Sequence, residues 1–138
     1  MSFLVLFLKK LDSIQLQQLD LSSNHLIGKI PKEFGILPSL FKLLLGNNNL
    51  SRSIPSELGN LSNLEILDLA PNNLSGEIPP LIRELQYLEM LNLSHNRLSG
   101  TIPHTFDELI SLTKQGQQVS CSDHNTPHRE HSIVLICF

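Results

Sequence analysis

The sequence is poor in the residues on which several common kinds of protein depend. It has no tryptophan, and aromatic residues make up only 5% of its 138 positions, so a core built from large rings is not expected. Its two cysteines, Cys121 and Cys137, allow one disulfide but not a disulfide framework. The formal net charge is −3 and no basic run is present, so we expect no nucleic-acid partner.

Long apolar segments and catalytic motifs are also missing. Residues 2–8 (SFLVLFL) are too few for a transmembrane helix, which needs about 20 apolar residues. They have the length of a minimal secretory signal core, but no positive charge precedes them and no small-residue cleavage site follows. We therefore predict neither a membrane span nor a working signal peptide. The Gly-rich and Asp motifs of protein kinases have no counterpart here.

Leucine, by contrast, is abundant, with 29 residues, and it recurs with a fixed period of 24 residues. Five columns hold leucine in all four repeats, and an Ile-Pro pair recurs in the same register. The leucine columns are 16/40/64/88, 19/43/67/91, 21/45/69/93, 26/50/74/98 and 37/61/85/109. Such a period predicts a solenoid in which neighbouring units bury each other's apolar side chains.

Each unit predicts a short strand, a turn and an irregular return. The alternation of Leu67 and Leu69 within residues 64–69 indicates a strand with one buried face, and four such strands would pair in parallel. The return over 56–61 is too short for a regular α-helix and is expected to be 3-10 or irregular. The predicted fold class is α/β, a curved solenoid of about four repeats with a concave parallel sheet and short convex returns.

One asparagine follows the strand in every repeat. We predict that these side chains are buried in the turn and bond backbone groups there, forming a ladder along the solenoid. The simpler interpretation is that asparagine is only a good turn former, which explains one such residue better than four in register. The asparagines are Asn24, Asn48, Asn72 and Asn96.

These residues resemble a known family. The pattern LxxLxxLxLxxNxLxGxIPxxLGxL, present here as LSNLEILDLAPNNLSGEIPPLIREL and LQYLEMLNLSHNRLSGTIPHTFDEL, is similar to the plant-specific leucine-rich repeat. That repeat is typical of the ectodomains of plant receptor-like kinases and receptor-like proteins. The resemblance implies a leucine-rich repeat solenoid in a plasma-membrane or extracellular glycoprotein. It also implies signalling through a peptide or protein ligand, or through a leucine-rich repeat co-receptor.

The sequence departs from this pattern at one turn position. The column reads Gly28, Arg52, Gly76 and Gly100, so the second repeat carries a bulky cation where the others have no Cβ. If the position needs a positive φ, Arg52 costs about 1 kcal/mol.

The repeat pattern sets the expected domain boundaries. It ends after residue 112, because Gln115, Gln117 and Ser120 stand where the next leucines and asparagine would be. We expect an apolar N-terminal segment (1–15) that serves as an improvised cap over the first leucines. The four repeats (16–112) and a disordered tail (113–138) follow. The cap is expected over Leu16, Leu19 and Leu21.

The tail is dense in metal-ligating residues. They are Cys121, His124, His128, His131 and Cys137. Together they could hold zinc, but their spacing fits no established zinc pattern and the segment lacks apolar scaffold residues. We favour the disordered tail and predict no metal and no cofactor.

The outward positions of the strands are the candidate ligand-binding surface. Apolar side chains stand there beside carboxylates where the scaffold does not require them, which suits a peptide or protein partner. The predicted site residues are Phe41, Lys42, Leu44, Glu65, Ile66, Asp68, Glu89, Met90 and Asn92. Gly46, Ala70 and Ser94 are expected to be outward-facing as well. We predict no catalytic residues, because a flat sheet has no closed pocket to make acid/base catalysts of its carboxylates.

Four N-glycosylation sequons begin at Asn49, Asn60, Asn73 and Asn92. Two of them follow from the repeat consensus itself. Asn92 would point from the concave sheet, so a glycan there would obstruct part of the binding surface.

The leading hypothesis is a non-enzymatic recognition module similar to part of a plant receptor-like kinase ectodomain. The alternatives are a secreted leucine-rich repeat inhibitor of a wall-degrading enzyme, and a truncated product without independent function. We also expect self-association, because uncapped solenoid ends expose apolar columns and unpaired strand edges.

Overall fold

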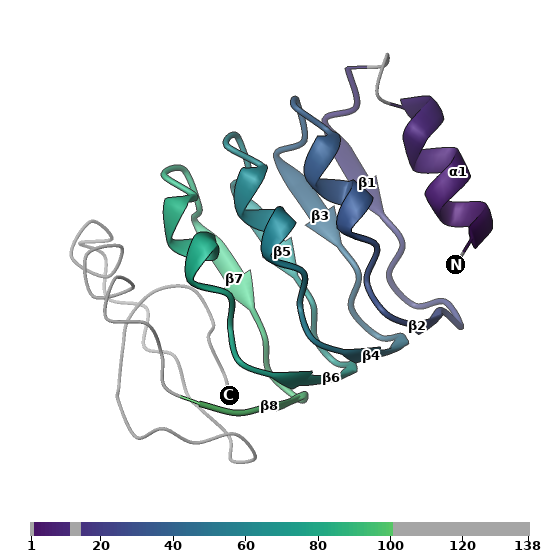
Figure 1. Cartoon of the computed structure of the whole chain (residues 1–138), viewed down its shortest axis with the longest axis vertical. Coiled ribbons are helices and arrows are strands. Elements are labelled where there is room, and N and C mark those ends of the chain that lie inside the picture. Colours follow the sequence, from purple (N-terminus) through teal and green to yellow (C-terminus); the bar gives the residue numbers. More distant parts are fainter. Residues whose placement is uncertain (1, 12–14, 101–138) are drawn as a thin grey trace.

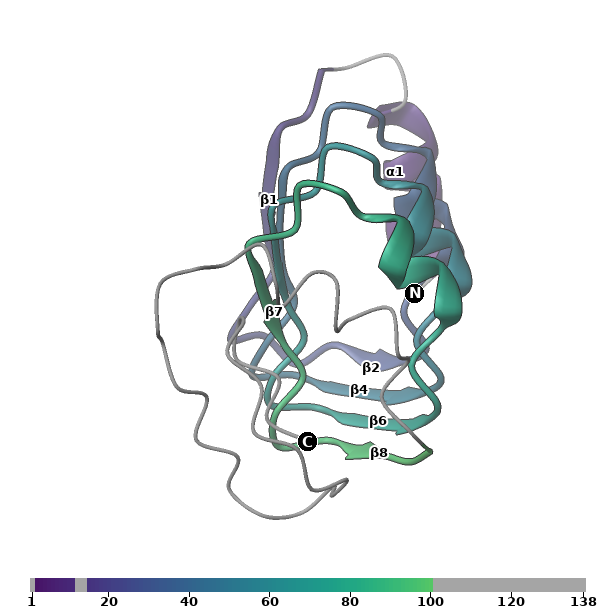
Figure 2. The same cartoon turned by 90° about the vertical axis from the view of Figure 1, so that its left-hand side faces the viewer.

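The computed structural model describes residues 2–11 and 15–100. After an α-helix, α1 (Ser2–Leu11), the described chain winds through successive coils that each contribute one strand to each of two parallel sheets (Figure 1). The two sheets and a row of 3-10 helices form three sides of the coil (Figure 2).

The first sheet is the one that the leucine columns predict. It consists of β1 (Gln18–Asp20), β3 (Lys42–Leu44), β5 (Ile66–Asp68) and β7 (Met90–Asn92), in this order and all parallel. Leu43 pairs with Leu67 and Leu67 with Leu91, so the register equals the 24-residue period. The predicted concave parallel sheet is therefore confirmed.

The second sheet was not predicted from the sequence. It is formed by β2 (Ile27–Gly28), β4 (Asn49–Arg52), β6 (Asn73–Gly76) and β8 (Arg97–Leu98). These strands contain only two to four residues, and each supplies at most one buried leucine, so no period-2 alternation is visible in the sequence. The sequence pattern indicated only an extended segment at the following Ile-Pro.

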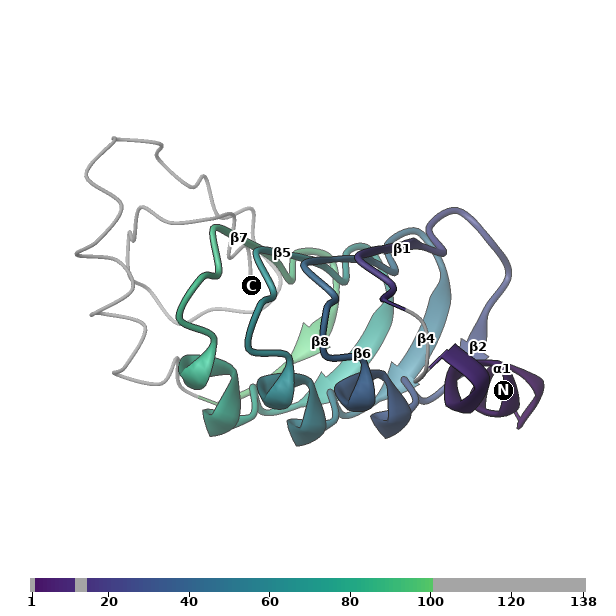
Figure 3. The ribbon, with the colours of Figure 1, turned by 90° about the horizontal axis from the view of Figure 1, so that it is seen from above.

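The returns are 3-10 helices, as the sequence predicts. They are η1 (Lys32–Ile36), η2 (Ser56–Asn60) and η3 (Pro80–Glu84). Each begins after a proline in extended conformation, and each buries one apolar residue: Phe34, Leu58 and Ile82. Viewed from above, they form a row on the side opposite the first sheet (Figure 3).

The core is a continuous column of leucines between these sides. Leu43 and Leu67 are fully buried, because described strands lie on both sides of theirs, and Leu91 is 1% exposed. In the first coil Leu16, Leu19, Leu21 and Leu26 are only partly buried.

The N-terminal helix covers the 3-10 side of the first coil, not the strand leucines that we expected it to cover. α1 packs chiefly against η1 and continues the row of 3-10 helices (Figure 3). Leu8 of this helix is fully buried in the core. The helix does not lie over the strand leucines, because its only deeply buried described side chain inserts on the 3-10 side. Within the described part of the chain, no helix has the length and apolar character needed to cross a membrane.

Residues 101–138 lie outside the described residues. The expected tail and its zinc alternative fall there, as does the second half of the fourth repeat. The proposed division into 1–15, 16–112 and 113–138 therefore stays a prediction.

Candidate functional site

The outward side of the first sheet forms one surface, which we call the concave face (Figure 2). It comprises the two outward residues of each of the strands β1, β3, β5 and β7, and the residue immediately before each strand. Three columns run along it in register. They are Gln17/Phe41/Glu65/Glu89, Gln18/Lys42/Ile66/Met90 and Asp20/Leu44/Asp68/Asn92.

Apolar side chains on this face are half-buried and adjacent to carboxylates. Ile66 pairs in register with Met90, and both remain partly exposed. Phe41 stands beside Glu65, whose backbone N–H donates to the Phe41 carbonyl at 2.8 Å. The leucines that alternate with these residues fill the core, so the outward apolar residues are free to contact a partner.

Two aspartates on the face have pKa values displaced in opposite directions. Burial raises the pKa of Asp68, and the nearby Asp20 carboxylate adds to this rise, although a hydrogen bond from the Ala70 backbone N–H (3.0 Å) opposes it. The hydroxyl and backbone N–H of Ser22 hold the pKa of Asp20 below its usual value, with a further contribution from Lys42. Both side chains close the turn after their strand, as Asn92 does toward Ser94.

The charge of the concave face is predominantly negative. Its described outward positions carry four carboxylates and one amine, that of Lys42. The carboxylates are Asp20, Glu65, Asp68 and Glu89. A partner with basic and apolar side chains therefore matches this surface better than an acidic one.

Three residues expected on the face are buried instead. Gly46, Ala70 and Ser94 follow the strands, where the chain turns inward. The hydroxyl of Ser94 donates to Asn92 Oδ1 at 2.7 Å, within the turn. The surface is therefore three columns wide rather than four.

The asparagine column joins consecutive coils. The side-chain amide of Asn72 donates to the carbonyls of Leu45 and Leu69, both at 2.9 Å, and its Oδ1 accepts from the backbone N–H of Leu50. Asn48 and Asn96 make the corresponding bonds. Asn24 bonds carbonyls of its own coil and is exposed. Asn48 and Asn72 are half-buried and Asn96 is buried, so the expectation that all four are buried is wrong at Asn24 and holds fully only at Asn96.

The sequon asparagines differ in accessibility. Asn49 and Asn60 are exposed, whereas Asn73 and Asn92 are half-buried. Oδ1 of Asn92 accepts from both the N–H and the hydroxyl of Ser94, so this amide already has partners on the concave face.

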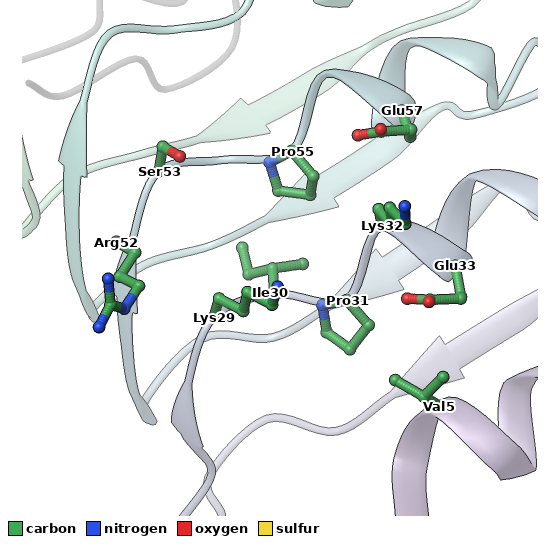
Figure 4. A pocket seen from close by; sticks show the side chains of 10 residues that line it. All are labelled: Val5, Lys29, Ile30, Pro31, Lys32, Glu33, Arg52, Ser53, Pro55 and Glu57. Atoms are coloured by element: carbon green, nitrogen blue, oxygen red, sulfur yellow. The ribbon is translucent and has the colours of Figure 1, made fainter. Parts of the chain in front are cut away.

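A second feature was missed by sequence reasoning. A groove of about 510 Å³ lies at the corner between the second sheet and the 3-10 helices, where the segments after β2 and β4 run side by side (Figure 4). Its lining includes Lys29, Lys32 and Arg52, with Ile30, Pro31 and Pro55. Arg52 has φ 65°, and Gly28, Gly76 and Gly100 are also at positive φ, so the condition for strain at Arg52 is met. Arg52 marks an unusual position in the sequence, but a cation in a glycine column does not by itself indicate a groove.

The described residues contain no group of three His, Cys, Asp or Glu side chains arranged to hold a metal ion. The Cys and His residues of the zinc alternative lie beyond them.

Comparisons with known proteins place these features in context. Two family models, both described as leucine-rich repeat, match residues 14–74 and 87–109. No curated protein matches the chain.

Several solved structures are similar to it. The BIR2 ectodomain from Arabidopsis thaliana is 40% identical with a TM-score of 0.67, and the match covers 79% of this chain and 56% of that one. The Arabidopsis receptor kinase HAESA, in complex with the peptide hormone IDA and the co-receptor SERK1, is 42% identical with a TM-score of 0.67 over 69% of this chain and 16% of that one.

A plant ice-binding protein is also similar, at 38% identity and a TM-score of 0.67 over 72% of this chain and 33% of that one. The chain thus spans between about one sixth and just over half of these three proteins. The same fold carries different activities among them, so function has to be argued from the surface.

Proposed function

This chain belongs to the leucine-rich repeat family, and from that premise we propose that it is a non-enzymatic module that recognises a peptide or protein. The recognition surface is the concave face, and the setting is the extracellular side of the plasma membrane, as part of a receptor-kinase-type ectodomain. A leucine-rich repeat co-receptor is the second partner we propose. The complex of HAESA with a peptide hormone and a co-receptor supports both suggestions by similarity.

The observation that carries the proposal is a cluster of apolar side chains on the concave face. Leu44, Ile66 and Met90 are only half-buried, although the fold needs no apolar side chain at these outward positions. The equivalent positions in the first coil are Asp20 and Gln18, so the solenoid tolerates polar residues there. An apolar cluster that the fold does not require indicates a contact surface.

The flanking carboxylates add orientation to this surface. Glu65 and Glu89 lie in register in one column, and Asp68 lies in the column on the other side of Ile66. An extended segment lying across the strands would place apolar side chains over Ile66 and Met90 in the central column. Its basic side chains would lie over the carboxylates of the two flanking columns. Such pairs contribute more to specificity and association rate than to affinity.

Panning a random 12-residue peptide library against the full chain tests this proposal. We expect selected peptides to lose at least about ten-fold in affinity toward Ile66→Arg and Met90→Arg, because a buried cation at a contact centre costs more than about 1.4 kcal/mol. Leu81→Arg is the matched control, since Leu81 is an exposed apolar residue on η3, on the opposite side.

Circular dichroism spectra of the three variants should coincide with that of the unmodified chain. Peptides that bind Ile66→Arg as well as the unmodified chain but fail on Leu81→Arg would place recognition on the convex side. That outcome would contradict the proposal.

A further inference from the structure

The groove at the corner of the second sheet combines an apolar floor with a cationic border. Ile30 is almost completely buried, Pro31 and Pro55 continue the floor, and Val5 of α1 closes one end (Figure 4). Arg52 and Lys29 lie at the other end of the groove (Figure 4). The carboxylates of Glu33 and Glu57 lie away from them, on the side of Lys32 (Figure 4). The cationic and mixed-charge ends are thus separated along the groove.

The cations at this groove have no partner within the described residues. Lys29, Lys32 and Arg52 are all exposed, and none of their side chains makes a hydrogen bond or an ion pair there. Glu33 and Glu57 are half-buried and likewise unpaired among those residues. The fold therefore does not use these three positive charges.

Arg52 is also held in an unfavourable backbone conformation. Its φ of 65° lies in the left-handed region, in a column where the other repeats have glycine. A residue other than glycine costs free energy there, and such strain tends to persist where it serves a function. Its guanidinium makes no hydrogen bond or ion pair with the described residues, so these polar contacts give no reason for a side chain at this position.

We propose that this groove is a second binding site, separate from the concave face, for an acidic and partly apolar segment of a protein partner. The planar guanidinium of Arg52 binds a carboxylate through two parallel hydrogen bonds, and Lys29 neutralises a second one. Apolar side chains of the segment cover Val5 and Pro55, the half-buried apolar residues of the lining.

The composition of the groove favours a protein segment over other anions. A small inorganic anion would use the cations but leave the apolar floor uncovered, and a polyanionic sugar would do the same. A volume of about 510 Å³ admits several side chains, in the range of pockets that enclose a ligand.

The probe for the test is a fluorescein-labelled octapeptide in which glutamate alternates with leucine and proline, titrated with the full chain and followed by fluorescence anisotropy. We expect saturable binding that weakens as salt increases, because the contacts are exposed charge pairs. Arg52→Gly should weaken binding about five-fold, the upper range for an exposed pair. Arg52→Lys should lose less affinity than Arg52→Gly, because it keeps the positive charge but not the two parallel hydrogen bonds.

The same variants report on folding. Arg52→Gly removes the strain, so its melting temperature should rise by about 4 °C while its affinity falls, an outcome that a misfolded variant cannot produce. Arg97→Gln, which removes an exposed cation of β8 that does not line the groove, should leave binding unchanged.

Absence of binding by the peptide would overturn the proposal. So would equal binding of a version with glutamine in place of glutamate, or equal losses from Arg52→Gly and Arg97→Gln. Binding of an oligogalacturonate without binding of the peptide would assign the groove to an anionic saccharide instead. These results are independent of the panning experiment, because Ile66→Arg and Met90→Arg do not touch the groove.

Discussion

At the scale of single residues, position 52 shows how one side chain can oppose the pattern of its repeat. The column at 28, 52, 76 and 100 has a positive φ in all four coils, and only Arg52 carries a side chain there. We expect Arg52→Gly to stabilise the protein by roughly 1 kcal/mol. Arg97→Gly is the control, because Arg97 is an exposed strand residue outside this column and should lose about 0.5–1 kcal/mol in the same urea melts.

Asp68 gives a prediction about pH. Its pKa is raised in the folded state, chiefly by burial, so the folded protein binds its proton more tightly than the unfolded chain does. The stability that this group contributes is therefore fully present below its unfolded pKa of about 3.9, and it is lost as the pH rises through the folded pKa. Asp68→Asn should be more stable than the unmodified chain at pH 7, with the difference vanishing at low pH.

The expected gain for Asp68→Asn is below about 1 kcal/mol, because water screens a half-exposed carboxylate. The turn should survive, since an amide oxygen can accept the Ala70 N–H as that of Asn92 accepts the Ser94 N–H. Thermal melts at pH 3.5 and pH 7 measure the difference. A variant less stable than the parent at pH 7 would show that the aspartate is favourably paired in the fold.

At the scale of the elements, the interior strands depend on leucines packed from both sides. Leu67 is fully buried between β3 and β7, so Leu67→Ala should cost about 2–5 kcal/mol through lost burial and the cavity that remains. Glu89→Ala, an exposed substitution on the same sheet, should change stability by no more than about 0.5 kcal/mol. Equal losses in urea melts would contradict the assignment of the buried face.

The 3-10 helices pack closely enough to require glycine at two contacts, Gly35 against Glu57 and Gly59 against Leu81. A Cβ added to Gly59 would lie only 2.6 Å from the carbonyl carbon of Leu81, in the next coil. Because backbone atoms must shift to admit it, Gly59→Ala should destabilise the protein by about 1–3 kcal/mol despite its better helix propensity. A stabilised Gly59→Ala in thermal melts would mean that η2 and η3 can separate without cost.

The elements also show which parts of the fold could be predicted from the sequence. The first sheet and the 3-10 returns follow from fixed columns of buried residues such as Leu67 and Leu58, and a period of 24 sets their register. The second sheet did not follow, because its strands are stabilised by backbone pairing between coils and show almost no side-chain pattern. The outward position of Ile66 was predictable from alternation, whereas burial of Ser94 depends on how the chain turns after its strand.

The groove at Arg52 was unpredictable for a related reason. It forms where α1 meets two successive coils, and the position of α1 depends on the packing of Leu8 against η1. No local pattern in residues 2–11 specifies that contact.

At the scale of the whole molecule, the N-terminal end carries apolar side chains that the fold leaves uncovered. Leu6 and Ile27 are 61% and 65% exposed, and Phe7 is also exposed. Ile27 stands where the next two coils have Ser51 and Ser75, so the scaffold does not require it. β1 is the outer strand of its sheet at this end, which adds an edge available for pairing.

We therefore expect concentration-dependent association, reduced by the combined variant Phe7→Ser and Ile27→Ser. Sedimentation velocity between about 1 and about 50 µM measures it, a concentration range that detects dimers with micromolar dissociation constants. Tyr87→Ser, which removes an equally exposed side chain elsewhere, is the control. A monomer throughout this range, or equal effects of both substitutions, would contradict association through the N-terminal end.

Methyl NMR of the full chain with a peptide selected by panning tests the central claim, recognition by the concave face, most directly. The account predicts shifts in the methyl signals of Leu44, Ile66 and Met90 as the peptide is added, with those of Ile36 and Leu81 on the 3-10 side unchanged. Shifts confined to Ile36 and Leu81, with the concave-face methyls unaffected at saturation, would contradict it.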